Sequence, residues 1–165
     1  ANEEQAEEIC VENIPTWKTG DSRDIHEILG GVEADMIFSC PPYADLEVYS
    51  DDERDISTLS YDQFVAAYKE IIIKTCSLLK DDSFACFVVG EVRDKKGIYR
   101  NFVGDTINAF IEAGLDYYNE GILVTPIGTL AIRTGRIFSA GRKFGKTHQN
   151  VLVFVKGDPK KATEK

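Results

Sequence analysis

The sequence predicts a mixed α/β domain with a mostly parallel sheet that ends in an antiparallel hairpin. Short, continuously apolar runs have the character of buried strands, and the longer segments between them place apolar residues at helical spacing. The last apolar run has no helix before it. Strands that alternate with helices favour parallel pairing, whereas a strand without an intervening helix turns back antiparallel.

Length and composition indicate one domain over residues 1–165. The chain has 165 residues, of which 43% are hydrophobic, enough for a single core. No apolar run is long enough to cross a membrane, and no secretory leader pattern opens the sequence. The four cysteines are widely spaced and only two histidines accompany them, so we expect reduced thiols, no metal site and a cytoplasmic setting.

The elements can be assigned in order along the chain. Ser60 and Gln63 form a capping box at the start of a long helix, and Gly114 is a stop signal for a second helix. The expected helices cover residues 2–14, 60–80 and 101–114, and the expected strands cover residues 16–21, 34–40, 83–90, 117–126 and 150–157.

A proline corner follows the strand at residues 34–40. Pro41 and Pro42 fix φ and lack an amide hydrogen, so they end the strand and leave carbonyl groups unpaired. Ligands of open α/β sheets bind beyond the carboxyl ends of the strands, which is where this corner falls. Free carbonyls can accept hydrogen bonds from an amino group, and the ring of Tyr43 can stack on a flipped base. The simpler interpretation is a strand terminator followed by a turn.

A basic segment interrupts an otherwise acidic chain. The net charge is −9, yet residues 121–157 contain six Lys and Arg residues and no Asp or Glu. Five of the six lie in or beside a polar, glycine-rich stretch at 129–148, predicted as a basic loop. A basic segment in an otherwise acidic chain favours binding to the phosphate backbone of a nucleic acid. The alternative interpretation is a solvated loop without a binding role. The five residues are Arg133, Arg136, Arg142, Lys143 and Lys146.

The run "DMIFSCPPY" resembles the catalytic motif (Asp/Asn/Ser)-Pro-Pro-(Tyr/Phe/Trp) of amino-group DNA methyltransferases. These enzymes transfer a methyl group from S-adenosylmethionine to adenine N6 or cytosine N4. "GDSRDI" and "GKTHQNVLVFVKGD" are similar to the segment before the catalytic loop and to the last strand of phage and bacterial DNA methylases. The resemblance implies a Rossmann-like methyltransferase sheet, S-adenosylmethionine as cofactor and DNA as partner.

The resemblance also implies roles for individual residues. Pro41 and Pro42 would shape the catalytic loop and Tyr43 would stack on the target base, while Cys40 stands where the family has Asp, Asn or Ser. Asp21 would lie near the adenine end of the cofactor, with Ser39 and Cys40 beside it. The five basic residues named above would contact DNA phosphates.

Part of the family pattern is missing. No glycine-rich loop after a first strand and no acidic residue after a second strand can be found, so the chain is expected to be the catalytic-loop half of the fold, without its first two strands. The strand at 34–40 would then have an open edge, filled by "TWKTG", a second copy or a missing N-terminal segment. Two alternatives remain: a non-catalytic nucleic-acid-binding module of the same fold, and an RNA or small-molecule methyltransferase.

Overall fold

The computed structural model describes residues 15–46 and 48–164. Four strands form one sheet in the order β1-β2-β4-β3, in which β1 pairs parallel with β2 and β4 pairs antiparallel with both β2 and β3. Three strands therefore run in one direction and β4 runs in the other, as predicted. The strands are β1 (Ala34–Ser39), β2 (Leu79–Val89), β3 (Asp116–Val124) and β4 (His148–Lys156).

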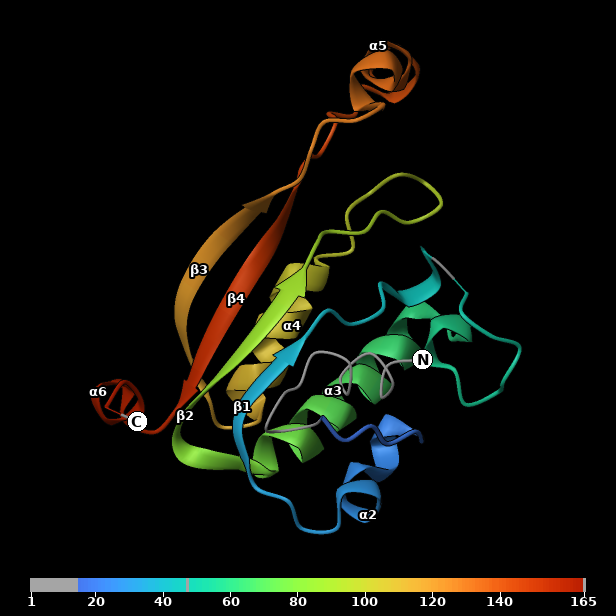
Figure 1. The fold of residues 1–165 in the computed structure, drawn as a ribbon. Coiled ribbons are helices and arrows are strands. Elements are labelled where there is room, and N and C mark those ends of the chain that lie inside the picture. The colour runs from blue at the N-terminus through green and yellow to red at the C-terminus, as the bar shows by residue number, and fades with distance from the viewer. Residues whose placement is uncertain (1–14, 47, 165) are drawn as a thin grey trace.

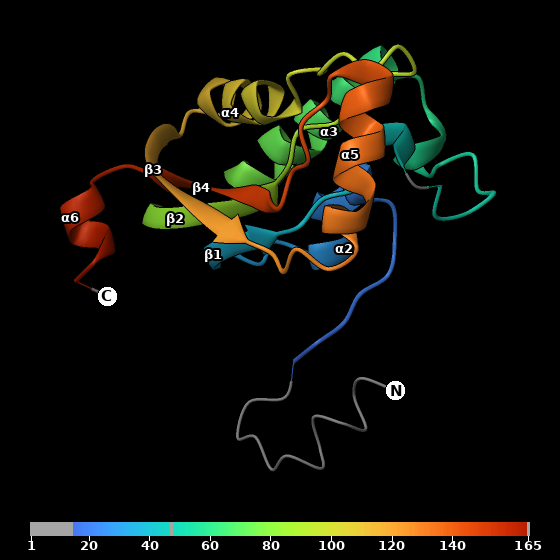
Figure 2. The same ribbon diagram turned by 90° about the horizontal axis from the view of Figure 1, so that it is seen from above.

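Two helices cover one face of this sheet (Figure 2). The α3 helix (Tyr61–Ser77) connects β1 to β2, and α4 (Phe102–Glu112) connects β2 to β3. The predicted capping box is present at the start of α3, where the Gln63 side chain accepts from the Ser60 amide at 3.3 Å. The remaining helices are short or peripheral: α2 (Ile25–Leu29), α5 (Leu130–Gly141), α6 (Pro159–Ala162) and single turns at η1 (Ser22–Asp24), η2 (Ala44–Leu46) and η3 (Ile56–Thr58).

The core lies between the sheet and the α3–α4 layer. Alternate residues of β2 face it, and aromatic rings from both helices fill it. Phe110 of α4 stacks on Phe154 of β4 with ring centroids 4.0 Å apart. Burying each such ring stabilises the fold by about 1.5–3 kcal/mol.

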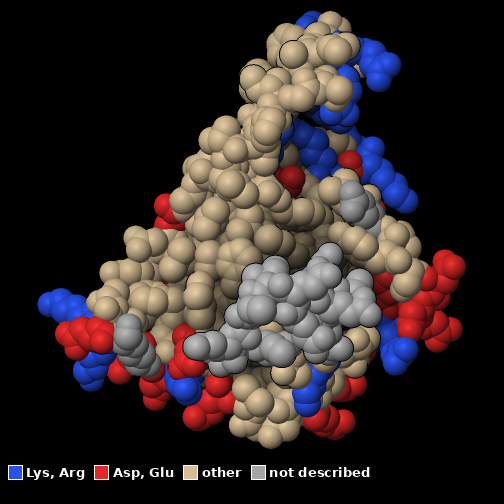
Figure 3. All heavy atoms as spheres, viewed as in Figure 1, with Lys and Arg blue, Asp and Glu red and all other residues tan. Residues whose placement is uncertain are grey.

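The opposite face of the sheet is largely apolar, and neither α3 nor α4 covers it; we call it the bare face. Met36 and Phe38 of β1 remain 56% and 64% exposed. A hollow of about 410 Å³ on this face is bordered at one end by α6; its lining is Asp35, Met36, Ser83, Phe84, Cys86, Val153 and Ala162. Figure 3 shows mainly uncharged atoms in the visible part of this face, with the charged side chains around its margin. Among the described residues, β1 pairs only with β2, so its other edge is open.

The structure differs from the predicted elements at residues 16–21 and 129–148. Residues 16–21 do not form the predicted strand. "TWKTG" makes no ladder of backbone hydrogen bonds with β1, so it does not fill the open edge of that strand. The predicted loop at 129–148 contains the α5 helix. The predicted helix at 2–14 lies outside the described residues. None of the described helices has the length and apolar character needed to cross a lipid bilayer.

Candidate active site at the proline corner

The proline corner directly continues β1. Pro41 is buried, Cys40 is exposed with a free thiol, and Tyr43 is half-buried at the start of η2. Two contacts hold the Tyr43 ring. Its edge meets Phe102 at a centroid distance of 5.9 Å and an interplanar angle of 80°, and the Gln149 side-chain amide donates a hydrogen bond to its hydroxyl.

Tyr43 lines a cleft of about 410 Å³ beyond the carboxyl ends of β1 and β2. Gly90, the residue after β2, is one of its lining residues. A Cβ atom placed on Gly90 would be 3.7 Å from the Lys146 ammonium and 3.8 Å from the Tyr43 hydroxyl, so these groups converge on one point. The full lining is Tyr43, Leu46, Gly90, Glu91, Val92, Thr125, Lys146, His148 and Gln149.

Burial dominates the electrostatics of this cleft. It raises the pKa of Tyr43, although the hydrogen bond from Gln149 acts in the opposite direction. It also lowers the pKa of Lys146, against the attraction of Glu91. The Glu91 carboxylate accepts from the amides of Phe102 and Val103, each at 3.2 Å, and thereby caps α4. The cleft thus combines an aromatic wall, a half-buried lysine and an acid that already has partners.

A salt bridge fixes the corner to the loop after β2. Arg100 donates to both carboxylate oxygens of Asp45 at 2.6 and 3.2 Å, and its guanidinium lies 4.7 Å from the centroid of the Tyr61 ring. These hydrogen bonds lower the pKa of Asp45. The sequence analysis did not single out Arg100, Glu91 or Gln149. Only Glu91 carried a signal, since it directly follows a strand that was predicted to be buried.

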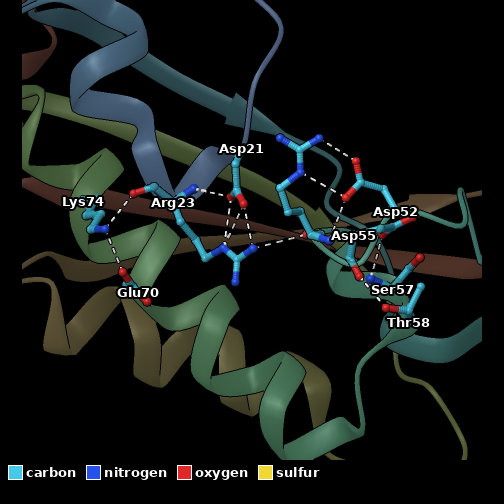
Figure 4. Close-up of polar contacts among 9 residues, drawn as sticks. Asp21, Arg23, Asp52, Asp55, Ser57, Thr58, Glu70 and Lys74 are labelled. Carbon is cyan, nitrogen blue, oxygen red and sulfur yellow. Dashed lines mark hydrogen bonds and ion pairs between the residues drawn. The ribbon is translucent and has the colours of Figure 1, made fainter.

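Asp21 lies in a different hollow, of about 320 Å³, built from the start of the described chain and the loop after the corner. Its carboxylate accepts from the amide and the guanidinium of Arg23 at 2.6–3.1 Å (Figure 4). These hydrogen bonds lower the pKa of Asp21. Asp21 and Tyr43 therefore line separate hollows, and both oxygens of Asp21 already have donors.

The five predicted DNA-contacting residues fall into two groups. Arg133, Arg136 and Arg142 are exposed on or just after α5, which lies at the far end of the projecting β3–β4 ribbon (Figure 1). Lys143 and Lys146 are half-buried and follow the helix back toward the sheet, where Lys146 enters the cleft. The described structure thus brings one of the five basic residues, Lys146, into the cleft at the corner, while Lys143 lies against Gly97.

Comparison with known proteins bears on the fold. No family model and no curated protein matches the sequence. Two structures of a candidate DNA modification methylase from Thermus thermophilus match 84% and 85% of this chain, at 18% and 17% identity and TM-scores of 0.59 and 0.61. The same protein in complex with S-adenosyl-L-methionine matches 85% of the chain at 17% identity and a TM-score of 0.58.

The chain has a methylase-type α/β fold. This confirms the predicted fold class. The matches cover 51%, 53% and 54% of the Thermus chains, so the present chain spans about half the length of the solved structures it resembles. In this methylase-type fold, the proline corner lies at the carboxyl end of the strand whose other edge is open.

Proposed function

We propose that the chain forms the catalytic-loop part of an S-adenosylmethionine-dependent DNA methyltransferase that modifies adenine N6 or cytosine N4. The observation that supports this most directly is the position of Tyr43, at the end of β1 in a methylase-type fold, in a cleft that also holds Lys146. A solved structure of the Thermus protein contains S-adenosyl-L-methionine, which supports the same cofactor here.

The corner suits an amine substrate. The lone pair of an exocyclic amine is delocalised into its base, so the amine is a weak nucleophile. The corner's backbone carbonyls would accept the amine hydrogens, and the Tyr43 ring would hold the flipped base in place. The Cys40 thiol is a weak hydrogen-bond acceptor, so the backbone carbonyl groups would accept the hydrogen bonds from the amine. S-adenosylmethionine supplies the methyl group when bound.

We assign part of the cofactor site to described residues. Ser39 and Cys40 lie at the carboxyl end of β1, where ligands of open α/β sheets bind. Asp21 lines a hollow large enough for a ligand moiety, but its carboxylate already accepts from Arg23. The glycine-rich loop and the ribose acceptor of the family have no counterpart in the sequence. We therefore assign to this chain the side of the cofactor nearest the substrate.

The α5 residues would contact the DNA backbone away from the corner. Removing one phosphate contact should reduce the slope of log affinity against log salt by about 0.9 for duplex DNA. Replacing Arg133, Arg136 and Arg142 with Gln should therefore flatten the slope. A matched control replaces Lys160 and Lys161 with Gln, because α6 lies at the opposite end of the molecule (Figure 1). An unchanged slope in the α5 variant would mean that this segment is a solvated helix.

The function is tested by binding to duplexes that contain one unpaired base. Removing the opposite base lowers the energy needed for flipping, so a base-flipping protein binds such a duplex more tightly. We expect the preference for unpaired adenine or cytosine over thymine to be seen in fluorescence anisotropy. An adenine preference supports N6 transfer and a cytosine preference supports N4 transfer. Equal binding to every unpaired base would favour the non-catalytic module, and equal binding to paired and unpaired duplexes would overturn base flipping.

Variants at Tyr43 link this preference to the corner. Tyr43→Ala should lose stacking of about 1–3 kcal/mol, which corresponds to roughly 5- to 150-fold in affinity. Tyr43→Phe keeps the ring and serves as the matched control. Full retention of the unpaired-base preference in Tyr43→Ala would exclude the stacking role. RNA with an unpaired adenine, used as a competitor, distinguishes an RNA substrate from DNA.

A further inference from the structure

The connection from β2 to α4 contains a basic turn, Arg93–Tyr99, that the sequence analysis did not assign. Its shape is fixed internally. The Asp94 carboxylate accepts from the Ile98 amide at 2.8 Å, and the Arg93 guanidinium donates to the Gly97 carbonyl at 2.8 Å. The same guanidinium lies 3.7 Å from the centroid of the Tyr99 ring. Lys95 and Lys96 are exposed at the tip of this turn, whose conformation these contacts stabilise.

This turn faces the segment that follows α5. The Lys143 ammonium lies against Gly97, at a place where any side chain on residue 97 would collide with it. Beside this contact lies a hollow of about 390 Å³, lined by Tyr99 of the turn and by Phe144 and Lys146 of the segment after α5. This hollow shares Glu91, Lys146 and His148 with the Tyr43 cleft, so the two are adjacent.

The surface beside the hollow is basic. Lys146 and Glu91 are the charged residues among those that line the hollow, and further lysines lie in the turn and after α5. Figure 3 shows Lys and Arg gathered between the projecting end that bears α5 and the neighbouring loop. The nearby carboxylates already have partners. Glu91 caps α4, and the hydrogen bond from Ile98 lowers the pKa of Asp94. The basic residues concerned are Lys95, Lys96, Lys143 and Lys146.

Aromatic rings alternate with these lysines. Tyr99 is 45% exposed, and Phe144 stays 81% exposed even though it stacks on Phe138 with centroids 6.0 Å apart. Exposed rings in a basic groove are the usual means of binding a nucleic-acid strand without reading its sequence, since every base has a face that can stack.

We propose that the turn Arg93–Tyr99 and the segment Lys143–Lys146 are the two walls of a groove that holds a DNA strand next to the target base. Lysines on both walls contact its phosphates, and Tyr99 and Phe144 stack on bases beside the one in the Tyr43 cleft. DNA as the ligand rests on the proposed function. The contribution of the turn to binding is new and can fail separately.

The test compares salt dependence among matched variants, with a fluorescein-labelled DNA duplex that carries one unpaired adenine. Replacing Lys95 and Lys96 with Gln should weaken binding at low salt and reduce the slope of log affinity against log salt by about 2. The Lys160→Gln, Lys161→Gln control should keep the wild-type slope. Both pairs are exposed, so their thermal unfolding should match that of the wild type. A wild-type slope in the turn variant would overturn the groove.

A further variant separates stacking from charge. Tyr99→Ala should lower the affinity by roughly 5- to 150-fold while leaving the salt slope unchanged. An unchanged affinity would remove Tyr99 from the groove. If the slope falls in the turn variant but unpaired bases are not preferred, the groove stands and base flipping fails. If the preference is present but the turn variant keeps its slope, base flipping stands and the groove fails. Absence of DNA binding by the wild type would overturn both.

Discussion

The Gln149 side chain in β4 donates a hydrogen bond to the Tyr43 hydroxyl across a separation of 106 residues. Phe102 of α4 supports the same ring from its edge. The orientation of the corner's aromatic wall therefore depends on elements from the second half of the chain. This makes Gln149 a positioning residue for the proposed base-binding surface.

Replacing Gln149 with Leu should raise the pKa of Tyr43 further, because the hydrogen bond it removes acts to lower that pKa. It should also destabilise the fold by about 1 kcal/mol, the usual net value of one hydrogen bond. An alkaline absorbance titration measures the tyrosinate signal, and the difference from Tyr43→Phe isolates residue 43. An unchanged pKa in Gln149→Leu would show that the hydrogen bond does not form in solution.

The chain alone should bind S-adenosylmethionine weakly or not at all. The sequence lacks the family's glycine-rich loop and ribose acceptor, and polar ligand groups left without partners cost about 1–3 kcal/mol each. Two or three such costs reduce affinity by several orders of magnitude. Isothermal titration of the cofactor into the purified chain measures this directly. Micromolar binding to a monomer would show that other residues hold the cofactor.

The open edge of β1 should promote pairing with a second copy or with a further segment of the fold. Sedimentation of the purified chain should therefore show concentration-dependent association. Phe38→Lys places a charge on the bare face, next to that edge, and should shift the chain toward monomer. Ile132→Lys is the matched control, since Ile132 is 84% exposed on the distant α5. Equal association of both variants would exclude the β1 region as the contact.

Stability should fall at alkaline pH. Burial raises the pKa of Cys76 from 9.0 to about 12, and it also raises the pKa values of Tyr61 and Tyr68. Above about pH 9 the unfolded chain releases these protons while the folded chain retains them, so folding becomes less favourable as the pH rises. Each such group lowers the free energy of unfolding by up to about 1.4 kcal/mol per pH unit between its two pKa values.

Urea unfolding between pH 7 and pH 10.5 measures this effect. Cys76→Ala removes the thiol that titrates first and should flatten the curve between pH 9 and pH 10, although its stability at pH 7 will be lower. An equal midpoint at both ends of the range for the wild-type chain would contradict the raised pKa values.

The sheet and its main helices could be predicted because burial leaves a periodic pattern. Phe64, Tyr68, Ile72 and Cys76 recur at helical spacing because one side of α3 packs on the sheet. The α5 helix was not predicted, because Gly135 interrupts it and the glycine and basic residues in and after it are typical of a loop; none of its residues is buried. Its basic side chains were recognised, but not the element that carries them.

The candidate site was only partly accessible from the sequence. The proline corner is a local signal, so Tyr43 could be placed at the end of a strand. Gln149, Arg100 and the turn at Arg93–Tyr99 depend on contacts between distant segments, and a polar residue in a loop gives no sign of its partner. Asp21 was expected near the cofactor from its place in a motif, and its pairing with Arg23 depends on local folding that the motif does not specify.

The bare face and the proposed basic groove should respond to added salt in opposite directions. Added salt weakens phosphate contacts by removing the gain from counterion release. Sulfate and phosphate salts strengthen the burial of apolar surface such as Met36, Phe38 and Phe84. If the proposed groove binds DNA, a salt step with these anions that releases the DNA should at the same time promote association through the bare face. Purification of the chain free of nucleic acid therefore calls for chloride salts and low protein concentration. Sulfate would release the DNA but would also cause the chain to associate and precipitate.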